Sequence, residues 1–521
     1  MNSDTNRDLN SDLNLDFNMN LKPNLELGHV KFVFFLGIGG IGMSSLARYF
    51  KQKGLWVGGY DRIQSDLCRQ MESEGMKIFF EDRVELIPDF FIKPSEGSLI
   101  VFTPSIPAHN KVKKYFESAG FPLWKRSVVL GKICENYRVI AVAGTHGKTT
   151  TCSMITHLLK TGGLDITSFL GGISTNYQTN FILGKSGIAV VEADEYDRSF
   201  LTLYPECAVI TSMDADHLDI YGNLENMIVA YNQFASQVII NGELITKAGL
   251  PIKRKHLEYK IKDSYLKESV NPTKNSFILK SNLQKTVEPD IWAENIHLED
   301  GSFEFDYSEN ENPLPGNHLL RNHLFIPGRH NIENAVAAIR VSLQLGIMPD
   351  KIQEGLASFL GVKRRFEYII KSECLIYIDD YAHHQDELRA FLTTVRELYP
   401  KRRITAIFQP HLFSRTRDFY LEMAESLSIA DELYLMDVYP AREEPMDGIS
   451  SKLILDNSYQ KEKFILSGSE ILERLKNGYS EVILTIGAGD IDRLVMPIKK
   501  ILEVKSDPKI YFSTKGGEKS I

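Results

Sequence analysis

The sequence predicts an α/β protein of three domains, each built around a largely parallel sheet. The chain has 521 residues, which at the usual domain size corresponds to about three domains, each able to bury its own core. Two apolar runs, 32–36 and 139–143, each lead through a glycine-rich loop into a segment with helical spacing of apolar residues. In the last third of the chain, polar clusters follow four successive predicted strands at 375–378, 404–408, 432–436 and 482–486, which predicts a further α/β sheet with a ligand edge.

Composition and charge narrow the classes of partner. The 60 Lys and Arg residues against 68 Asp and Glu give a net charge of −8, which offers no general attraction to nucleic acid or to an anionic membrane. Five scattered cysteines without C-x-x-C spacing argue against a disulfide framework or a zinc cluster. No apolar run approaches the roughly 18 residues of a membrane span, and the start lacks the regions of a signal peptide. We therefore expect a cytoplasmic protein with small-molecule partners, no nucleic acid and no membrane insertion, either a monomer or a homodimer.

The first domain is predicted at 29–136, after a polar, Asn-rich tract at 1–28 that can bury little surface and is expected to be a disordered extension. It carries Gly37-Ile-Gly39-Gly40-Ile41-Gly42 between a strand and a helix, with Asp61 about 20 residues further on. This pattern fits NAD. The same backbone cradle can also hold the diphosphate of another nucleotide, such as a UDP-sugar, with Asp61 at its ribose or base, and a structural turn is the third alternative. A strand at 98–102 ends in Thr103 and Ser105, at the edge where ligands of such folds bind.

The second domain, at 137–359, is predicted around Gly144-Thr145-His146-Gly147-Lys148-Thr149-Thr150. The two glycines let backbone N–H groups turn toward an anion at a helix start, Lys148 can reach the terminal phosphates, and the Thr149 hydroxyl can ligate Mg²⁺. Val142 stands where a longer P-loop has its first glycine, so this is the shorter G-x-x-G-K-T-T form. An ordinary strand-to-helix turn explains neither the Lys-Thr pair nor the strand before it, and the loop therefore predicts nucleotide binding.

Two further runs of this domain, 188–191 and 208–210, lead into acids and a histidine on the side of the sheet that holds this loop. Glu192 and His217 can share Mg²⁺ ions with Thr149 and the phosphates. The acids beside them fit equally well as solvated loop residues or helix caps; they are Asp194, Asp197 and Asp216.

The rest of the second domain is less informative. Residues 242–316 contain short alternating pieces and are predicted to form a small peripheral β element with a structural role. His330 and Asn331 then stand at the start of a strongly helical segment, where they can face an adenine or ribose. For Asn331 a helix-capping role competes with nucleotide contact.

The third domain is predicted at 360–505, followed by a tail at 506–521. Arg364 and Arg365 lie at its junction and can reach the ATP phosphates when the domain closes, unless they belong to a solvated linker. The adjacent His383 and His384 invite a zinc hypothesis, but loops after parallel strands also use histidine as a hydrogen-bond donor.

Seven motifs occur in a characteristic order: G-I-G-G-I-G-M, A-G-T-H-G-K-T-T-T, V-E-A-D-E-Y-D, D-A-D-H-L-D, G-R-H-N-I-E-N, D-D-Y-A-H-H and F-Q-P-H. With them the chain resembles the Mur ligase family of peptidoglycan synthesis over about 29–500. The resemblance implies a Rossmann-like N-terminal domain for a UDP-sugar, a central P-loop ATPase domain and a Rossmann-like C-terminal domain for an amino acid. It also favours the diphosphate cradle over an NAD site.

The resemblance further implies a reaction and its site residues. ATP phosphorylates the carboxylate of UDP-N-acetylmuramate, the amine of L-alanine attacks the acyl phosphate, and the products are the amide, ADP and phosphate. Lys148, His217 and Arg365 are then expected to be catalytic. The expected binding residues are Gly144, Thr145, His146, Gly147, Lys148, Thr149, Thr150, His330, Asn331 and Arg365 for ATP; Thr149, Glu192 and His217 for Mg²⁺; Gly37, Gly39, Gly40, Ile41, Gly42, Asp61, Thr103 and Ser105 for the UDP-sugar; and His383, His411 and Arg415 on the amino-acid side.

Three rival functions stay open from the sequence. A nicotinamide oxidoreductase would use the glycines at 37–42 and leave Lys148 idle. A P-loop regulatory switch would hydrolyse ATP without a second substrate and would give the polar strand ends of the third domain no role. The family's muropeptide-recycling ligase joins a preformed tripeptide to the same sugar, and Gln385 and Leu412 depart from the pattern expected of alanine-adding members.

Overall fold

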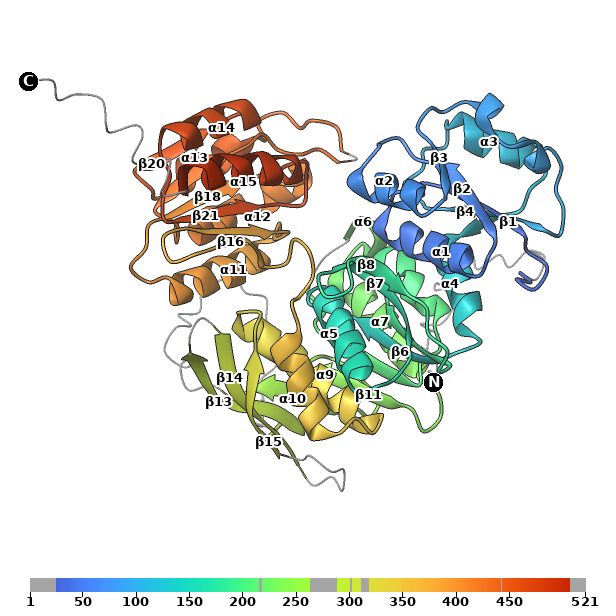
Figure 1. Cartoon of the computed structure of the whole chain (residues 1–521), viewed down its shortest axis with the longest axis horizontal. Helices are drawn as coiled ribbons and strands as arrows, with labels where there is room; N and C mark the ends of the chain where they lie inside the picture. The colour runs from blue at the N-terminus through green and yellow to red at the C-terminus, as the bar shows by residue number, and fades with distance from the viewer. Residues whose placement is uncertain are drawn as a thin grey trace, which may run out of the picture.

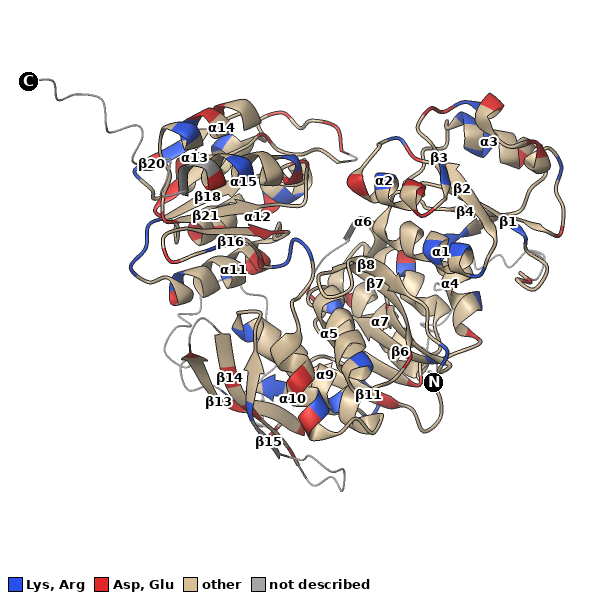
Figure 2. Cartoon of the chain, viewed as in Figure 1, with Lys and Arg blue, Asp and Glu red and all other residues tan. Residues whose placement is uncertain are grey.

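The structure, a computed structural model, describes residues 25–214, 218–262, 288–299, 302–310, 318–441 and 443–506. These residues form three sheets, and each sheet with its helices makes its own lobe, with the first and third lobes both standing on the middle one (Figure 1). Basic and acidic residues are interspersed over all three lobes (Figure 2). None of the helices in the described part of the chain is both long and apolar enough to cross a membrane.

The first domain holds a five-stranded parallel sheet in the order β3-β2-β1-β4-β5. Its central strand is apolar throughout because both faces are covered. Val33 and Phe35 pack on the side of α1. Phe34 and Leu36 pack on the opposite side, with α3. The elements are β1 Phe32–Leu36, α1 Ile41–Gln52, β2 Trp56–Tyr60, α2 Asp66–Ser73, β3 Lys77–Phe79, β4 Ser98–Phe102, α3 Lys111–Ser118, β5 Leu123–Lys125 and α4 Arg126–Cys134.

The middle domain holds a ten-stranded sheet in the order β15-β14-β13-β12-β11-β10-β6-β9-β7-β8. The segment predicted as a peripheral β element is part of this sheet, since β12 pairs in parallel with β13, and β13 and β14 form an antiparallel extension. The strands are β6 Arg138–Ala143, β7 Thr167–Ser174, β8 Thr179–Ile182, β9 Ile188–Glu192, β10 Cys207–Ile210, β11 Glu243–Lys247, β12 Leu257–Ile261, β13 Ile291–Glu299, β14 Ser302–Glu309 and β15 His318–Leu324. The helices are α5 Lys148–Thr161, α6 Leu218–Tyr221, α7 Leu224–Ser236, α9 Arg329–Gln344 and α10 Pro349–Ser358.

The third domain holds a six-stranded sheet in the order β16-β17-β21-β18-β19-β20, parallel except for the edge strand β16. Its strands are β16 Glu367–Lys371, β17 Ile376–Asp380, β18 Ile404–Phe408, β19 Glu432–Leu435, β20 Glu462–Ile465 and β21 Val482–Ile486. Its helices are α11 Gln385–Leu398, α12 Phe413–Leu427, α13 Ser451–Asn457, α14 Gly468–Asn477 and α15 Asp492–Ser506. The starts of α11 and α12 face the middle domain, which brings both into one site.

Helix α1 fixes the first domain on the middle one. Arg48 of α1 is 1% exposed, and it is bound by Glu74 at 2.7 Å and by Asn180 of β8. The ring of Tyr49 lies 5.8 Å from that of Phe169 in the middle domain. Because a buried guanidinium is costly unless it is paired, these contacts hold α1, and with it the loop before α1, in one position.

Candidate active site

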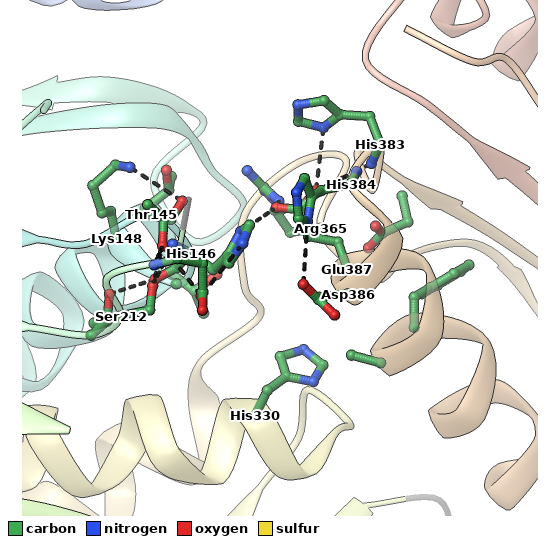
Figure 3. A pocket seen from close by; sticks show the side chains of 18 of the residues that line it. Thr145, His146, Lys148, Ser212, His330, Arg365, His383, His384, Asp386 and Glu387 are labelled. Carbon is green, nitrogen blue, oxygen red and sulfur yellow. Dashed lines mark hydrogen bonds and ion pairs between the residues drawn. The ribbon is translucent and has the colours of Figure 1, made fainter. Parts of the chain in front are cut away.

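A cavity of about 890 Å³ lies between the strand ends of the middle domain and the third domain (Figure 3). Its walls come from the loop after β6, the ends of β9 and β10, the start of α9, the junction at 361–366, and the starts of α11 and α12. Segments far apart in the sequence therefore line one cavity, of a size suited to a nucleotide-sized ligand.

The loop at 144–150, called here the second glycine loop, turns from β6 into α5 with close contacts at both glycines. Gly144 has φ +136°, and a Cβ there would lie 2.1 Å from the Thr211 hydroxyl. Gly147 has φ +81°, and a Cβ there would lie 2.7 Å from the Asn334 side-chain oxygen. Only glycine meets both demands, so the loop keeps its backbone N–H groups at the start of α5, where anions bind.

Lys148 is held inside this loop by a buried acid. Its Nζ lies 2.8 Å from an oxygen of Glu195, whose side chain is 1% exposed, and it also donates to the Gly144 carbonyl. Burial alone would lower the pKa of Lys148, but Glu195, Asp194 and Glu192 together raise it above the ordinary lysine value. The ammonium therefore stays charged and is kept where a phosphate would meet it.

Thr149 and Glu192 offer oxygen ligands side by side. The Thr149 hydroxyl donates to Glu192 at 3.0 Å, and the Gly171 N–H donates to the other carboxylate oxygen at 2.9 Å. Burial raises the pKa of Glu192, although Lys148 and these hydrogen bonds oppose the shift. The charge of this buried carboxylate is only partly balanced by its neighbours. A carboxylate of this kind beside a hydroxyl group suits a hard cation such as Mg²⁺. His217, the third predicted ligand, lies outside the described residues, within which no cluster of three or more His, Cys, Asp or Glu could hold a metal.

Thr145 and His146 connect the second glycine loop to the segment after β10 and to α11 of the third domain. Thr145 and Ser212, after β10, share a hydrogen bond of 2.8 Å between their hydroxyl groups, and the His146 N–H donates to the same Ser212 oxygen at 2.8 Å. The His146 ring reaches the third domain, with Nδ1 3.1 Å from Glu387 of α11. Thr150, the last predicted loop residue, also lines the cavity.

The start of α9 forms a second wall. His330 is exposed to the cavity, and its pKa is lowered to about 4 by removal from bulk solvent and by the nearby cations Lys247 and Arg365. Asn331 is 5% exposed, and its amide donates to the Pro327 carbonyl at 2.7 Å. The capping alternative for Asn331 is wrong, because the N-cap of α9 is Gly328 and Asn331 stands inside the first turn.

The side chains of the two junction arginines, Arg364 and Arg365, point to different places. Arg365 lines the cavity, with Nη1 3.6 Å from Glu387 and its guanidinium 5.2 Å from the centre of the Tyr381 ring. Arg364 turns into the third domain and binds Asp379 at 3.0 Å. Arg364 has φ +60°, so the reversal of the chain between them is a strained turn. The linker alternative therefore does not apply to Arg365.

The residues predicted on the amino-acid side come together at the far end of the cavity. His383, His411 and Arg415 all line it. The rings of His383 and His411 lie 5.5 Å apart, edge to face, and His411 stacks on Tyr439 at 5.7 Å. These contacts fix the two imidazoles from loops after β17 and β18.

The glycines at 37–42, called here the first glycine loop, lie elsewhere, and neither they nor Asp61, Thr103 and Ser105 line this cavity. A Cβ on Gly37 would lie 2.7 Å from Thr103, so the loop touches the end of β4. The Gly39 N–H donates to Asp61 at 2.8 Å. One Asp61 oxygen thus holds the loop itself, a role that the sequence did not indicate.

Sequence reasoning missed several of the contacts that organise the site. Glu195 was not singled out from the sequence; its position three residues after Glu192 in one acidic segment is the signal that could have found it. Asp194 turns the other way and binds Arg126 of the first domain at 3.0 Å. Glu387 carried no signal, because an acid in the first turn of a helix is common for reasons of capping alone.

Known proteins match this chain along its length. The family models described as "Mur ligase family, catalytic domain", "Mur ligase middle domain" and "Mur ligase, glutamate ligase domain" match residues 33–138, 142–342 and 364–489. A UDP-N-acetylmuramate–L-alanine ligase of Christiangramia forsetii is 42% identical over 477 residues, covering 92% of this chain and 99% of that protein.

Two solved structures have the same fold. The UDP-N-acetylmuramate–alanine ligase of Thermotoga maritima is 26% identical, with a TM-score of 0.75 and coverage of 91% of this chain and 99% of that chain. A murein peptide ligase of Psychrobacter arcticus is 22% identical, with a TM-score of 0.62 and coverage of 90% and 99%, and this likeness concerns the fold alone.

Proposed function

The chain belongs to the Mur ligase family, and we propose that it joins L-alanine to the carboxylate of UDP-N-acetylmuramate at the expense of ATP. The observation that carries this proposal is the meeting, in one cavity, of the second glycine loop and the His383, His411 and Arg415 side of the third domain. Identity of 42% over nearly the whole length of an alanine-adding relative supports alanine over a tripeptide as the acceptor.

The first step is acyl phosphate formation. An oxygen of the sugar's carboxylate attacks the γ-phosphorus of ATP, the bond to the β–γ bridging oxygen breaks, and ADP leaves with that electron pair. Lys148 and the N–H groups at the start of α5 hold the phosphates and stabilise the charge that develops. Mg²⁺, when bound, neutralises phosphate charge, and Thr149 and Glu192 would hold it together with His217.

The second step is attack by the acceptor. The neutral amine of alanine attacks the acyl carbon, the carbon–oxygen bond to phosphate breaks, and phosphate leaves with that electron pair and takes up the proton that the amine nitrogen gives up. The acceptor carboxylate needs a fixed cation, for which we propose Arg415. His383 and His411, fixed by their ring contacts, would orient the amine toward the acyl carbon.

The first glycine loop is the proposed cradle of the UDP diphosphate. We propose that 29–136 binds the sugar nucleotide, 137–359 binds ATP and 360–505 binds the amino acid. Because ATP and a nucleotide-linked sugar are both intracellular metabolites, we also propose that the reaction takes place in the cytoplasm.

Phosphate release tests the proposed function. The purified protein is given ATP, Mg²⁺ and UDP-N-acetylmuramate, with L-alanine, glycine, L-serine or the tripeptide of the recycling reaction as acceptor. We expect the highest kcat/KM with L-alanine and little release with the tripeptide. Glycine should give a lower value because it lacks one methyl group, worth about 1–3 kcal/mol in a fitted pocket, and L-serine because its added hydroxyl group would have to enter a pocket fitted to a methyl group. A tripeptide that is the better acceptor at equal concentration would make the recycling reaction the correct assignment.

A further inference from the structure

One carboxylate of the third domain is shared by three nitrogen-bearing side chains from three segments. Glu387 stands in the first turn of α11, and Figure 3 shows it facing His146 and Arg365. Its Oε1 lies 3.1 Å from His146 Nδ1 and 3.6 Å from Arg365 Nη1. Its Oε2 lies 3.3 Å from His383 Nδ1 and accepts the His383 N–H at 3.1 Å.

The two oxygens of Glu387 therefore serve different sites. His146 belongs to the second glycine loop, whereas His383 lies on the amino-acid side of the cavity. An ionised carboxylate only accepts hydrogen bonds, so His146 must present an N–H to Oε1. The Nδ1 of His383 also lies 2.9 Å from the Tyr381 carbonyl, which likewise only accepts, so the hydrogen bond that ties the His383 loop to Oε2 is the one from its backbone N–H. The position of the nucleotide loop and the position of the acceptor loop are thus set by one rigid planar group.

The burial of Glu387 makes its charge dependent on the groups around it. The Glu387 side chain is 16% exposed, and its burial alone would raise its pKa. The neighbouring His383 and His146 outweigh burial and hold the pKa of Glu387 well below its usual range. A buried carboxylate charge is costly unless other groups pair with it. Replacing one of its oxygens by a nitrogen would leave one of those groups without a hydrogen-bond acceptor.

We propose that Glu387 is a positioning residue that couples the nucleotide subsite to the acceptor subsite, fixing His146 with one oxygen and His383 with the other. The proposal rests on the proposed function, since it takes ATP and an amino acid as the two ligands. It predicts that bound nucleotide and bound acceptor influence each other's affinity through this carboxylate.

A merely structural role is the competing explanation. Glu387 also completes the capping box of α11, in which its side chain accepts from the N–H of His384. If capping were its whole role, a substitution would lower stability and leave the relation between the two ligands unchanged. Binding measurements therefore discriminate where activity alone does not.

The first test uses Glu387→Gln, which keeps the size of the side chain and one accepting oxygen. The dissociation constant of L-alanine is measured by calorimetry in the presence of UDP-N-acetylmuramate, with and without a non-hydrolysable ATP analogue. Couplings between sites are typically about 5- to 150-fold. We expect a factor in this range for the unmodified protein and a factor near one for Glu387→Gln. An unchanged factor in the variant, or no coupling in the unmodified protein, would overturn the proposal.

Glu397→Gln is the matched control. Glu397 stands in the last turn of the same helix and makes a similar contact between domains, at 3.1 Å from Arg329 of α9, yet neither residue lines the cavity. This variant should keep the coupling of the unmodified protein. Loss of coupling in both variants would mean that general docking of α11 is responsible and would refute a special role for Glu387.

A double-mutant cycle tests the contact itself. His146→Ala and Glu387→Gln are compared singly and together by kcat/KM for L-alanine. Residues in contact show non-additive effects of about 0.5–3 kcal/mol, which is roughly 2- to 150-fold in rate. We expect the double variant to be clearly more active than the product of the two single effects predicts. Strict additivity would contradict the proposal, whereas inactivity of the unmodified protein with L-alanine would count against the proposed function and not against this contact.

Discussion

The two glycine loops of this protein are built alike and surrounded differently. Each connects a buried parallel strand to the start of a helix, β1 to α1 and β6 to α5. The first has no cation of its own, and its N–H at Gly39 is bound by Asp61. The second contains Lys148 and is contacted by Glu192, the last residue of β9, and by Glu195, three residues later. The first loop therefore fits the proposed role of cradling an anion that does not react, whereas the second has a fixed cation and oxygen ligands, as the proposed phosphate chemistry requires.

The surroundings also connect the two loops. The loop after β9 sends Glu192 and Glu195 to the second glycine loop and Asp194 to Arg126. The Arg126 guanidinium lies against the first loop, since a Cβ on Gly42 would be 2.7 Å from it. A single acidic segment thus borders both loops, as expected if the proposed cradle of the sugar nucleotide lies next to the proposed phosphate site.

Lys148→Ala should have the largest effect and tests whether the cation makes the difference between the loops. It removes the ammonium that is proposed to meet the transferring phosphate, and we expect turnover to fall by about 10²-fold or more. Binding of UDP-N-acetylmuramate, measured by calorimetry, should not change. Glu195 would be left buried without its partner, so the thermal midpoint of unfolding must be measured as well. A folded variant with near-normal turnover would contradict the assignment of the second glycine loop as the phosphate site.

Gly39→Val is expected to have the next largest effect and tests the first loop. A Cβ at Gly39 would lie 2.6 Å from the Cys68 sulfur and 2.9 Å from Asp61, so a side chain there must displace the loop. We expect UDP-N-acetylmuramate to bind about tenfold more weakly or worse, a cost of about 1.4 kcal/mol or more, while ATP binding stays largely intact.

The control for this substitution is Gly97→Ala in the same domain. The nearest atom to a Cβ at Gly97 is 3.7 Å away, which is ordinary contact. Both ligands should bind this variant normally. Equal loss of both ligands in Gly39→Val would show that the substitution disrupts the fold or that the two loops do not act separately.

The sequence predicts those features of the two loops that depend on residues close together in the chain. The strands predicted at 404–408 and 482–486 are β18 and β21 to the residue, and 139–143 is β6 without Arg138. Strands buried on both faces leave a continuous apolar run, and a loop that turns into a helix leaves glycines at fixed spacing. Both signals depend on neighbours in the chain.

Long-range pairings left no such signal. The residues around Arg364 and Arg365 do not indicate that Arg365 faces the cavity while Arg364 turns into the third domain. Nor does the local sequence indicate that β12 pairs with β13. The contact of His146 with Glu387 joins residues 241 positions apart. Such contacts follow from how three domains pack, and each partner alone has an ordinary local explanation.

The helices that follow the two loops differ in how they bury a basic side chain. In α1, Arg48 is paired with the carboxylate of Glu74. In α5, His157 is 7% exposed, and its ring nitrogens bond to the hydroxyl groups of Tyr177 at 2.9 Å and Ser358 at 3.0 Å. Without a countercharge, burial lowers the pKa of His157 to about 4. Only the second helix should therefore respond to mild acid.

This difference leads to the prediction with the smallest effect at neutral pH, where His157→Gln should leave turnover nearly unchanged. In the unfolded chain a histidine takes up a proton below about pH 6.5, whereas in the folded protein His157 stays neutral down to about pH 4. Its contribution to stability is therefore complete above pH 6.5 and is lost as the pH falls toward 4. Between pH 6.5 and 5 the loss amounts to about 2 kcal/mol. Guanidinium unfolding at pH 7 and pH 5 should show a larger drop in midpoint for the unmodified protein than for His157→Gln, in which this group no longer titrates and the other acids are the same. Equal drops would mean that His157 is protonated in the folded state, and that α5 buries a charge as α1 does.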